Sequence, residues 1–388
     1  MRGSTRKRGS TWTALWDLPA DPMTGDRRQA SKGGFRTQKD AQRHLAGVVI
    51  SVGEGTYVEP SKQPLARFLV DEWLPGIGAT VRPLTHHRYE RIVSTYVVKR
   101  DIGGVPLRAL NAGHLNALYS ELEHEGLSIA TRRLTHAVLR RALNDAVRWG
   151  KLARNPAGAA DPPSLPRSRA QAWTAGELRR FLGHVREDRL FALWRLAATT
   201  GMRRGELLGL PWQLVDLDGG RLRVEQQLVP TKGGCTFGPP KSRRSERTIA
   251  LDAETLQQLR RHHATQLLER DLAGPAYEDQ DLVFADELGR PIHPQRLTEW
   301  FMRHRKAAGI PVGSLHILRH TSATLALTAT PPVPLHVVAG RLGDDPKTIL
   351  GTYAHLLPHS DAMAADAVAA AIVDSPLTVA APDPVEVP

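Results

Sequence analysis

Near the carboxyl end of the chain, residues that can act on a phosphate group follow one another at short spacing. His316, Arg319 and His320 stand in one H-x-L-R-H string. Tyr353 follows in the string G-T-Y-A-H. On a helix, His316 and Arg319 are one turn apart, so an arginine fork can hold a phosphate while an imidazole moves a proton beside it. A phenol downstream can then attack that phosphate, and the pattern predicts DNA strand transfer.

Two further basic residues lie upstream of this string. Arg203 stands in T-G-M-R-R-G-E, residues 200–206, and Lys241 stands in P-K-S. Breaking a phosphodiester without metal or water requires a nucleophile, positive charge on the non-bridging oxygens, and a proton for the departing 5' oxygen. The chain offers all three, so neither a cofactor nor a metal ion is required.

Each of these residues has an expected role. We expect Arg203 and Arg319 to hold the non-bridging oxygens, since their planar forks stay charged at any working pH. His316 would be the proton acceptor beside the tyrosine or a phosphate oxygen. Lys241, on a loop between two predicted strands, would protonate the leaving group once its pKa is lowered by neighbouring arginines. Tyr353 would be the nucleophile and form a 3'-phosphotyrosine.

Each residue also has an ordinary structural explanation. Arg203 beside Glu206 suits a surface ion pair, and Lys241 stands in a basic loop that could bind phosphates nonspecifically. His316 and His320 are spaced i, i+4, as in some zinc sites, but no H-E-x-x-H motif is present and the chain has one cysteine. The joint occurrence of all five groups in one order favours the catalytic interpretation.

Composition indicates a nucleic-acid partner. The chain of 388 residues has a net charge of +12, and lysine and arginine displace condensed counterions from DNA. The length suits two or three domains. One cysteine excludes an intrachain disulfide. No apolar run approaches the roughly 20 residues that cross a membrane, and no signal peptide is evident. We therefore expect a cytoplasmic protein without membrane contact.

Residues 1–58 form a small basic unit with ten Lys or Arg against five acids, a net of +5. Alternation over 12–16 predicts a strand, and 27–31 predicts a second strand after a turn. Gly33 and Gly34 are expected to break the chain. Thr37 and Asp40 then cap a helix through Val49. The unit is expected to contain three short strands and one helix.

The rest of the chain is mostly helical. Apolar residues at three- and four-residue spacing predict a bundle of about four helices over 62–157. A Pro, Ser and Arg-rich linker precedes a larger domain over 173–373, whose first helix is capped by Thr174. Strand signals at 222–229 and 248–251 predict a small antiparallel sheet there. The fold class is mixed α+β with several domains, and the tail 374–388 is expected to be disordered.

The motifs around Arg203, Lys241, His316 to His320 and Tyr353 together resemble the catalytic domain of the tyrosine recombinase, or phage integrase, family. The basic unit 1–58 resembles the arm-type DNA-binding domain of bivalent integrases, and 62–157 stands where the family has its core-binding domain. This resemblance implies double-stranded DNA with core and arm sites as partner, a homotetramer on DNA, and room for an accessory DNA-bending or directionality factor. It also implies a terminal helix passed to a neighbouring subunit, for which these residues would serve: Ser360, Ala364, Ala367, Val368, Ala371 and Ile372.

The resemblance favours integration or excision of a phage or another mobile element, because housekeeping Xer-type resolvases lack the basic amino-terminal module. Two other functions stay open. A degenerate integrase could act as a DNA-binding architectural protein or repressor. A type IB topoisomerase uses much the same residues but has no arm-binding module.

Asp344 departs from the family pattern. Nine residues before the tyrosine a Leu-Gly-His is usual, and its histidine donates to the phosphate, whereas here Gly343 is followed by Asp344. An ionised carboxylate cannot donate a hydrogen bond and repels a phosphate. We expect Asp344 to turn toward a basic neighbour, Arg341 or Lys347, and to help fix the helix that begins at Asp345 and Pro346 and carries the tyrosine.

Overall fold

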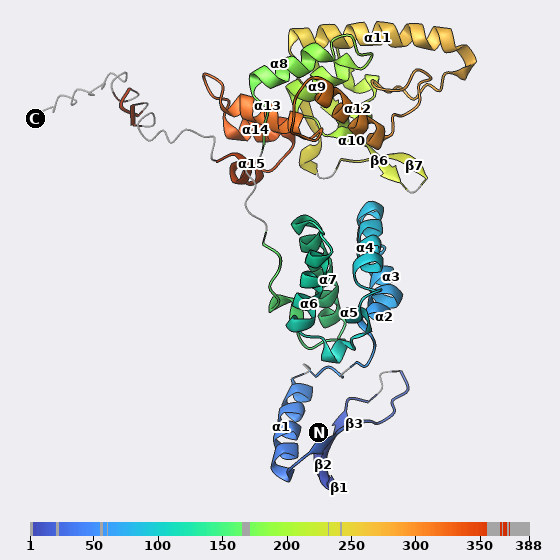
Figure 1. Ribbon diagram of the computed structural model, residues 1–388, viewed down its shortest axis with the longest axis vertical. Helices are drawn as coiled ribbons and strands as arrows, with labels where there is room; N and C mark the ends of the chain where they lie inside the picture. The colour runs from blue at the N-terminus through green and yellow to red at the C-terminus, as the bar shows by residue number, and fades with distance from the viewer. Residues whose placement is uncertain are drawn as a thin grey trace, which may run out of the picture. The chain divides into compact units, whose positions relative to one another are not determined.

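The computed structural model describes residues 3–20, 23–54, 57–59, 61–164, 171–231, 233–240 and 243–354, with 365–366, 368–370 and 372. The chain divides into two compact units, Met1–Arg167 and Ser168–Pro388 (Figure 1). No helix in these parts of the chain is long and apolar enough to cross a membrane. The tail 374–388 and most of the residues predicted for the exchanged terminal helix lie outside the described residues.

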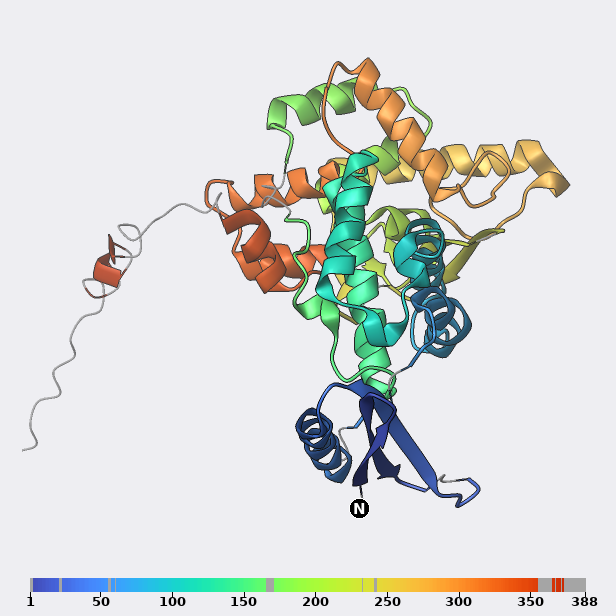
Figure 2. The same ribbon diagram turned by 60° about the horizontal axis from the view of Figure 1, so that its bottom comes forward.

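The first unit begins with a three-stranded antiparallel sheet in the order β1-β2-β3, with helix α1 beside it (Figure 2). Ala14 and Trp16 of β2 and Val52 of α1 form its small buried core. Thr37 caps α1 by accepting the N–H of Asp40, as predicted. The bounds are β1 Gly3–Arg8, β2 Thr11–Leu18, β3 Arg28–Phe35 and α1 Gln38–Gly53.

The predicted chain break at Gly33 and Gly34 is wrong, because β3 continues through both glycines. The pairing of β2 with β3 shifts between Trp12 and Ala14, and Gly34 has a φ of +86°. Both features are typical of a β-bulge. A Cβ on Gly33 would lie 3.1 Å from the Thr13 hydroxyl oxygen. The glycines therefore let the bulged strand pass close to its neighbour instead of ending it.

The remainder of the first unit is a helical bundle, as predicted. The apolar stripe of α6 is buried, and Trp73 donates its indole N–H to Asp145 at 2.9 Å inside the core. Arg132 is buried and pairs with Glu123 at 2.8 Å. The elements are α2 Leu65–Arg67, a π-helical turn Phe68–Trp73, α3 Leu74–Ile77, α4 Pro83–Tyr96, α5 Asp101–Gly104, α6 Ala112–His124, α7 Ile129–Arg148, and 3-10 turns Leu107–Ala109 and Pro156–Gly158.

The second unit is mostly helical around an apolar core that contains Trp173, Phe181, Trp194 and Phe301. Its helices are α8 Ala175–His184, α9 Phe191–Thr200, α10 Arg204–Leu208, α11 Ala253–Ala273, α12 Pro294–Ala307, α13 Ile317–Leu327, α14 Leu335–Leu342 and α15 Pro346–Tyr353. The 3-10 turns are Trp212–Leu214, Arg243–Ser245 and Gly274–Ala276. Its α13 packs against α9 and α14, and α14 packs against α15 (Figure 1).

The predicted strand 222–229 is two strands in two separate sheets. β5 lies between β4 and β8, whereas β6 pairs only with β7 among the described strands. The chain turns away after β5 because β6 packs against α10, where two glycines permit a close approach. A Cβ on Gly209 would lie 2.6 Å from the Leu228 nitrogen, and one on Gly205 would lie 2.8 Å from the Leu228 oxygen. The bounds are β4 Val215–Asp216, β5 Arg221–Val224, β6 Gln227–Thr231, β7 Gly234–Gly238 and β8 Arg247–Ala250.

Candidate active site

Four of the five sequence-predicted residues come together in the second unit, where the end of α9, the start of α13 and the α14–α15 junction meet. Arg203 and Arg319 contact one shared carboxylate. The charges of both arginines also act on the imidazole of His316, and that of Arg319 acts on the phenol of Tyr353. Lys241 lies outside the described residues, between β7 and β8.

The turn between α9 and α10 positions Arg203. Gly201 ends α9 in the left-handed region, with a φ of +64°. A side chain there would collide with Leu342, because a Cβ would lie 2.4 Å from its Cδ2. The chain can therefore fold close under α14 only at a glycine. Arg203 is the N-cap residue of α10, and its guanidinium group points toward the end of α14.

A buried carboxylate, Glu206, holds the Arg203 fork. The side chain of Glu206 is 1% exposed. It accepts from the Arg203 backbone N–H at 3.0 Å, from Arg203 Nη1 at 2.8 Å and from Arg247 Nη2 at 2.9 Å. Burial by itself raises the pKa of Glu206, but Arg247 and Arg203 outweigh burial and lower it. The Arg203–Glu206 pair that the sequence allows as a surface pair is thus an interior one.

Arg319 is almost fully enclosed, with 4% of the residue exposed. Its Nη1 donates to the carbonyl of Gly201 at 2.7 Å, and its Nη2 donates to the carbonyl of Leu342 at 2.8 Å. These carbonyls close α9 and α14, so the helix ends fix the plane of the guanidinium. Burial and the nearby Arg203 charge lower the pKa of Arg319. Because a buried cation without a counter-charge is energetically costly, Arg319 requires an anion beside it.

Asp344 supplies that anion, and the expectation that it turns toward Arg341 or Lys347 is wrong. Its Oδ1 lies 2.5 Å from Arg203 Nη2, and its Oδ2 lies 2.5 Å from Arg319 Nη2. The reason is the turn that follows α14, where Gly343 adopts a φ of +67° and aims the next residue back at the arginines. Arg341 faces elsewhere and donates to backbone carbonyls of Thr199 and Ala250.

The histidine in contact with the tyrosine is His320. Tyr353, the last residue of α15, is 3% exposed, and its hydroxyl oxygen lies 2.5 Å from His320 Nδ1. The rings of His316 and His320 lie edge to face with centroids 4.8 Å apart. The sequence assigns the proton acceptor to His316 and leaves His320 without a role. The i, i+4 spacing within H-x-L-R-H, considered there for zinc, is the feature that could have indicated it.

At neutral pH the phenol and the two imidazoles are in the protonation states from which a proton could pass from Tyr353 to a histidine. Burial raises the pKa of Tyr353 to about 12, so the phenol is protonated at neutral pH. Burial and the Arg319 charge lower the pKa of His320. Burial and the nearby cationic groups lower the pKa of His316 to about 4. Both rings are therefore neutral at pH 7, and in the tautomer that carries its proton on Nε2, His320 accepts the hydrogen bond of the phenol at Nδ1.

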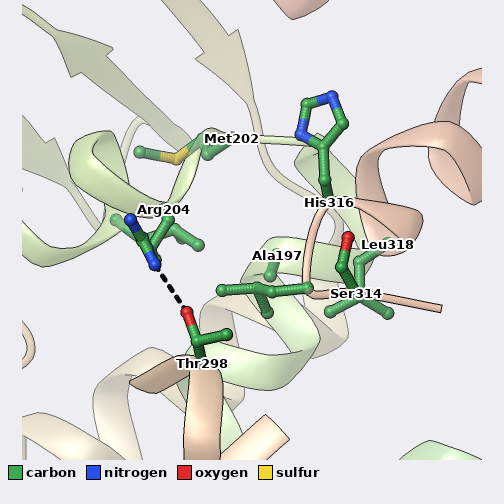
Figure 3. A pocket seen from close by; sticks show the side chains of 9 residues that line it. Ala197, Met202, Arg204, Thr298, Ser314, His316 and Leu318 are labelled. Atoms are coloured by element: carbon green, nitrogen blue, oxygen red, sulfur yellow. Dashed lines mark hydrogen bonds between the residues drawn. The ribbon is translucent and has the colours of Figure 1, made fainter. Parts of the chain in front are cut away.

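A cavity of about 270 Å³ adjoins His316 and is lined mainly by apolar side chains with Arg204, Thr298 and Ser314. Figure 3 shows the Arg204 guanidinium directed at Thr298, to which it donates at 2.6 Å. The imidazole of His316 lies on another side of the cavity (Figure 3). In the parts of the chain that the structure describes, no three His, Cys, Asp or Glu side chains gather as a metal site would require.

Two family models match the chain. The phage integrase family matches residues 173–359, and an arm DNA-binding domain matches residues 4–49. The chain is also 26% identical over 343 residues to a tyrosine recombinase XerC-like protein of Caldanaerobacter subterraneus subsp. tengcongensis, covering 83% of this chain and 87% of that protein.

Solved structures share the fold. One is the Tn1549 transposon integrase in complex with transposon right end DNA, with a TM-score of 0.64 and 19% identity over 80% of this chain and 100% of that chain. Another is a lambda integrase tetramer bound to a Holliday junction, with a TM-score of 0.55 and 20% identity over 89% of this chain and 96% of that chain. Both share the mixed α+β architecture described above.

Proposed function

Because the chain belongs to the phage integrase family of tyrosine recombinases, we propose that it cuts and rejoins DNA strands at specific sites through a 3'-phosphotyrosine intermediate. One observation carries the proposal. Two arginine forks converge on a single anion beside a buried tyrosine whose hydroxyl is hydrogen-bonded to a neutral histidine. The groups that would serve as nucleophile, as base and as the charge stabilising a pentavalent phosphate are therefore close together, which supports the proposal.

Each residue then has one task. Arg203 and Arg319 hold the two non-bridging oxygens of the scissile phosphate. The Tyr353 oxygen attacks phosphorus while its proton passes to His320 Nδ1. The bond from phosphorus to the 5' oxygen breaks, and Lys241 protonates that oxygen. His316 stands beside the phosphate as a hydrogen-bond partner. Attack by a 5' hydroxyl on the phosphotyrosine reverses these steps and reseals the strand.

We assign the domains accordingly. Residues 1–58 bind arm sites, 62–157 bind one side of the core site, 173–373 perform the chemistry, and 374–388 form a tail. The arm-domain match and the likeness to a transposon integrase support integration or excision of a mobile element, and we assign this activity to the cytoplasm. The likeness to a tetramer on a Holliday junction supports a homotetramer acting on two duplexes.

A nicked suicide duplex carrying the core site tests the proposal. The short strand that leaves after cleavage prevents resealing, so we expect a protein–DNA adduct that survives denaturation. Asp344 in place of the usual histidine specifically favours the second candidate, a DNA-binding protein that does not cleave. Specific binding without any adduct would establish that candidate. Relaxation of supercoiled DNA without recombination would indicate a topoisomerase.

A further inference from the structure

The carboxylate of Asp344 is held in the way that the two non-bridging oxygens of a phosphodiester could be held. Each of its oxygens accepts from a different arginine, Oδ1 from Arg203 and Oδ2 from Arg319, both at 2.5 Å. A phosphodiester likewise has two non-bridging oxygens that carry its negative charge. The other hydrogen bonds from the terminal nitrogens of these two guanidinium groups go to protein oxygens, at Glu206, Ser245, Gly343, Gly201 and Leu342.

Repulsion between like charges prevents two anions from contacting Arg203 and Arg319 at the same time. A phosphate that approached the two forks with the carboxylate in place would meet a like charge at contact distance, which is unfavourable. The anion cannot simply be absent from the free protein either, because Arg319 is buried and an unpaired buried cation is costly. One anion at a time therefore satisfies the two arginines.

We propose that Asp344 is an internal substitute for the scissile phosphate: in the DNA-free protein it occupies the seat between Arg203 and Arg319, keeps both forks in their working positions, and is displaced by the incoming DNA phosphate. Asp344 is thus a positioning residue in the free protein and a competitor of the substrate. Its identity as the phosphate's competitor rests on the proposed function, since that function makes the anion a DNA phosphate.

Displacement requires only a side-chain rotation. The backbone N–H of Asp344 donates to the carbonyl of Ala339 at 3.0 Å and closes the end of α14. The next residue, Asp345, caps α15 by accepting the N–H of Lys347 at 2.9 Å. Both helix ends therefore hold the backbone of this turn. The carboxylate can leave the seat toward solvent, because the side chain of Asp344 is 23% exposed.

The test measures the binding of inorganic phosphate to the full-length protein by the shift in its melting temperature. Asp344→Asn keeps the side-chain shape and removes the competing charge. We expect the variant to melt at a lower temperature than wild type in chloride buffer, and phosphate to restore it. We expect the apparent affinity for phosphate to be at least about tenfold higher than in wild type. The variant has no charged side chain that competes with phosphate for the two arginines, and a hydrogen bond to a charged group contributes about a factor of ten in binding.

Two controls locate the effect. Asp345→Asn removes the same charge one residue away, where the carboxylate pairs with Arg244, and it should respond to phosphate as wild type does. Adding Arg203→Ala to Asp344→Asn should abolish the gain in affinity. If Asp344→Asn does not fold in chloride, Asp344→His, purified in phosphate and then dialysed, provides the same comparison.

Equal phosphate affinity in wild type and both Asp344 variants would overturn the inference, as would a gain that survives Arg203→Ala. Failure of the proposed function is distinguishable from either result. In that case the protein would form no adduct on the suicide duplex, although Asp344→Asn would still increase the affinity for phosphate.

Discussion

The hydroxyl oxygen of Tyr353 lies 2.5 Å from Nδ1 of His320, which makes this imidazole the nearest described base to the proposed nucleophile. Its partner ring His316 stands one turn earlier and contacts His320 edge to face. Because burial raises the pKa of Tyr353 to about 12, the phenol needs a base at neutral pH. Substitutions of His320 and of His316 should therefore change the cleavage rate and its pH dependence in different ways.

His320→Ala should slow single-turnover cleavage by about 10² to 10⁴, the range that general-base catalysis supplies. In the wild type, the pKa of His320 lies below the usual value of 6.5, so the ring is neutral above pH 6.5 and we expect a plateau there. The rate should fall only as the pH drops through the lowered pKa and the ring becomes charged. Without the base, the rate should follow the phenolate fraction and rise about tenfold per pH unit toward the pKa of the phenol.

His316→Ala is the matched control for that experiment. It removes a neighbouring imidazole but not the hydrogen bond to the phenol, so cleavage should be slower while the plateau above pH 6.5 persists. If the plateau disappears in His316→Ala and persists in His320→Ala, the two rings have the opposite roles.

Tyr353→Phe should abolish the covalent adduct and leave DNA affinity within about twofold, because one hydroxyl contributes no charge contact to a phosphate. The measurement is a denaturing gel of the suicide-substrate reaction beside a binding titration at fixed salt. An adduct formed by the Phe variant would show that another residue is the nucleophile.

Arg319→Lys should keep DNA binding but slow cleavage by about 10² to 10³, the usual cost of losing a preorganised donor to the reacting group. The lysine retains the charge but not the planar fork that reaches both Gly201 and Leu342. Arg244→Lys, an exposed arginine paired with Asp345, is the control and should cleave normally. Near-normal cleavage by Arg319→Lys would reduce this arginine to a structural role.

Glu206→Gln should lower the free energy of unfolding by about 3 to 5 kcal/mol, because it leaves Arg203 and Arg247 without their buried counter-charge. The folded pKa of Glu206 lies below its ordinary value of 4.5, so its contribution to stability is full above that value. It is lost as the pH falls through the folded pKa. Urea denaturation at pH 7 measures the difference. Glu225→Gln, which breaks an exposed pair with Arg223, should cost under about 1 kcal/mol, and equal costs would contradict the interior role of Glu206.

Deleting residues 1–58 should leave cleavage of core sites intact and stop integrative recombination. The deleted unit carries a net charge of +5, and bridging two DNA sites depends on linking two binding modules at high effective concentration. Recombination assays with full attachment sites, run beside suicide-duplex cleavage, separate the two effects. Integration by the truncated protein at the full-length rate would remove the arm-binding assignment.

Much of this protein follows from local sequence. Helix caps at Thr37, Thr174 and Asp345 are confirmed because capping depends on residues within one turn of each other. The apolar stripes of the bundle and the mixed α+β fold are confirmed for the same reason, since periodicity of 3.6 or 2 is a property of neighbouring residues. The motif order also identifies the family, which the matches confirm.

Tertiary structure determined which charged and titratable side chains contact one another. The sequence predicts local partners for Asp344, but the left-handed Gly343 turns its carboxylate onto two arginines that lie 25 and 141 positions away in the chain. His316 and His320 are equivalent by type, and the packing of α13 and α15 against α14 sets which ring contacts Tyr353. The split of 222–229 between two sheets likewise depends on α10 arriving beside β6. Such contacts between distant segments have no periodicity in the sequence, because they arise only when the packed elements bring the segments together.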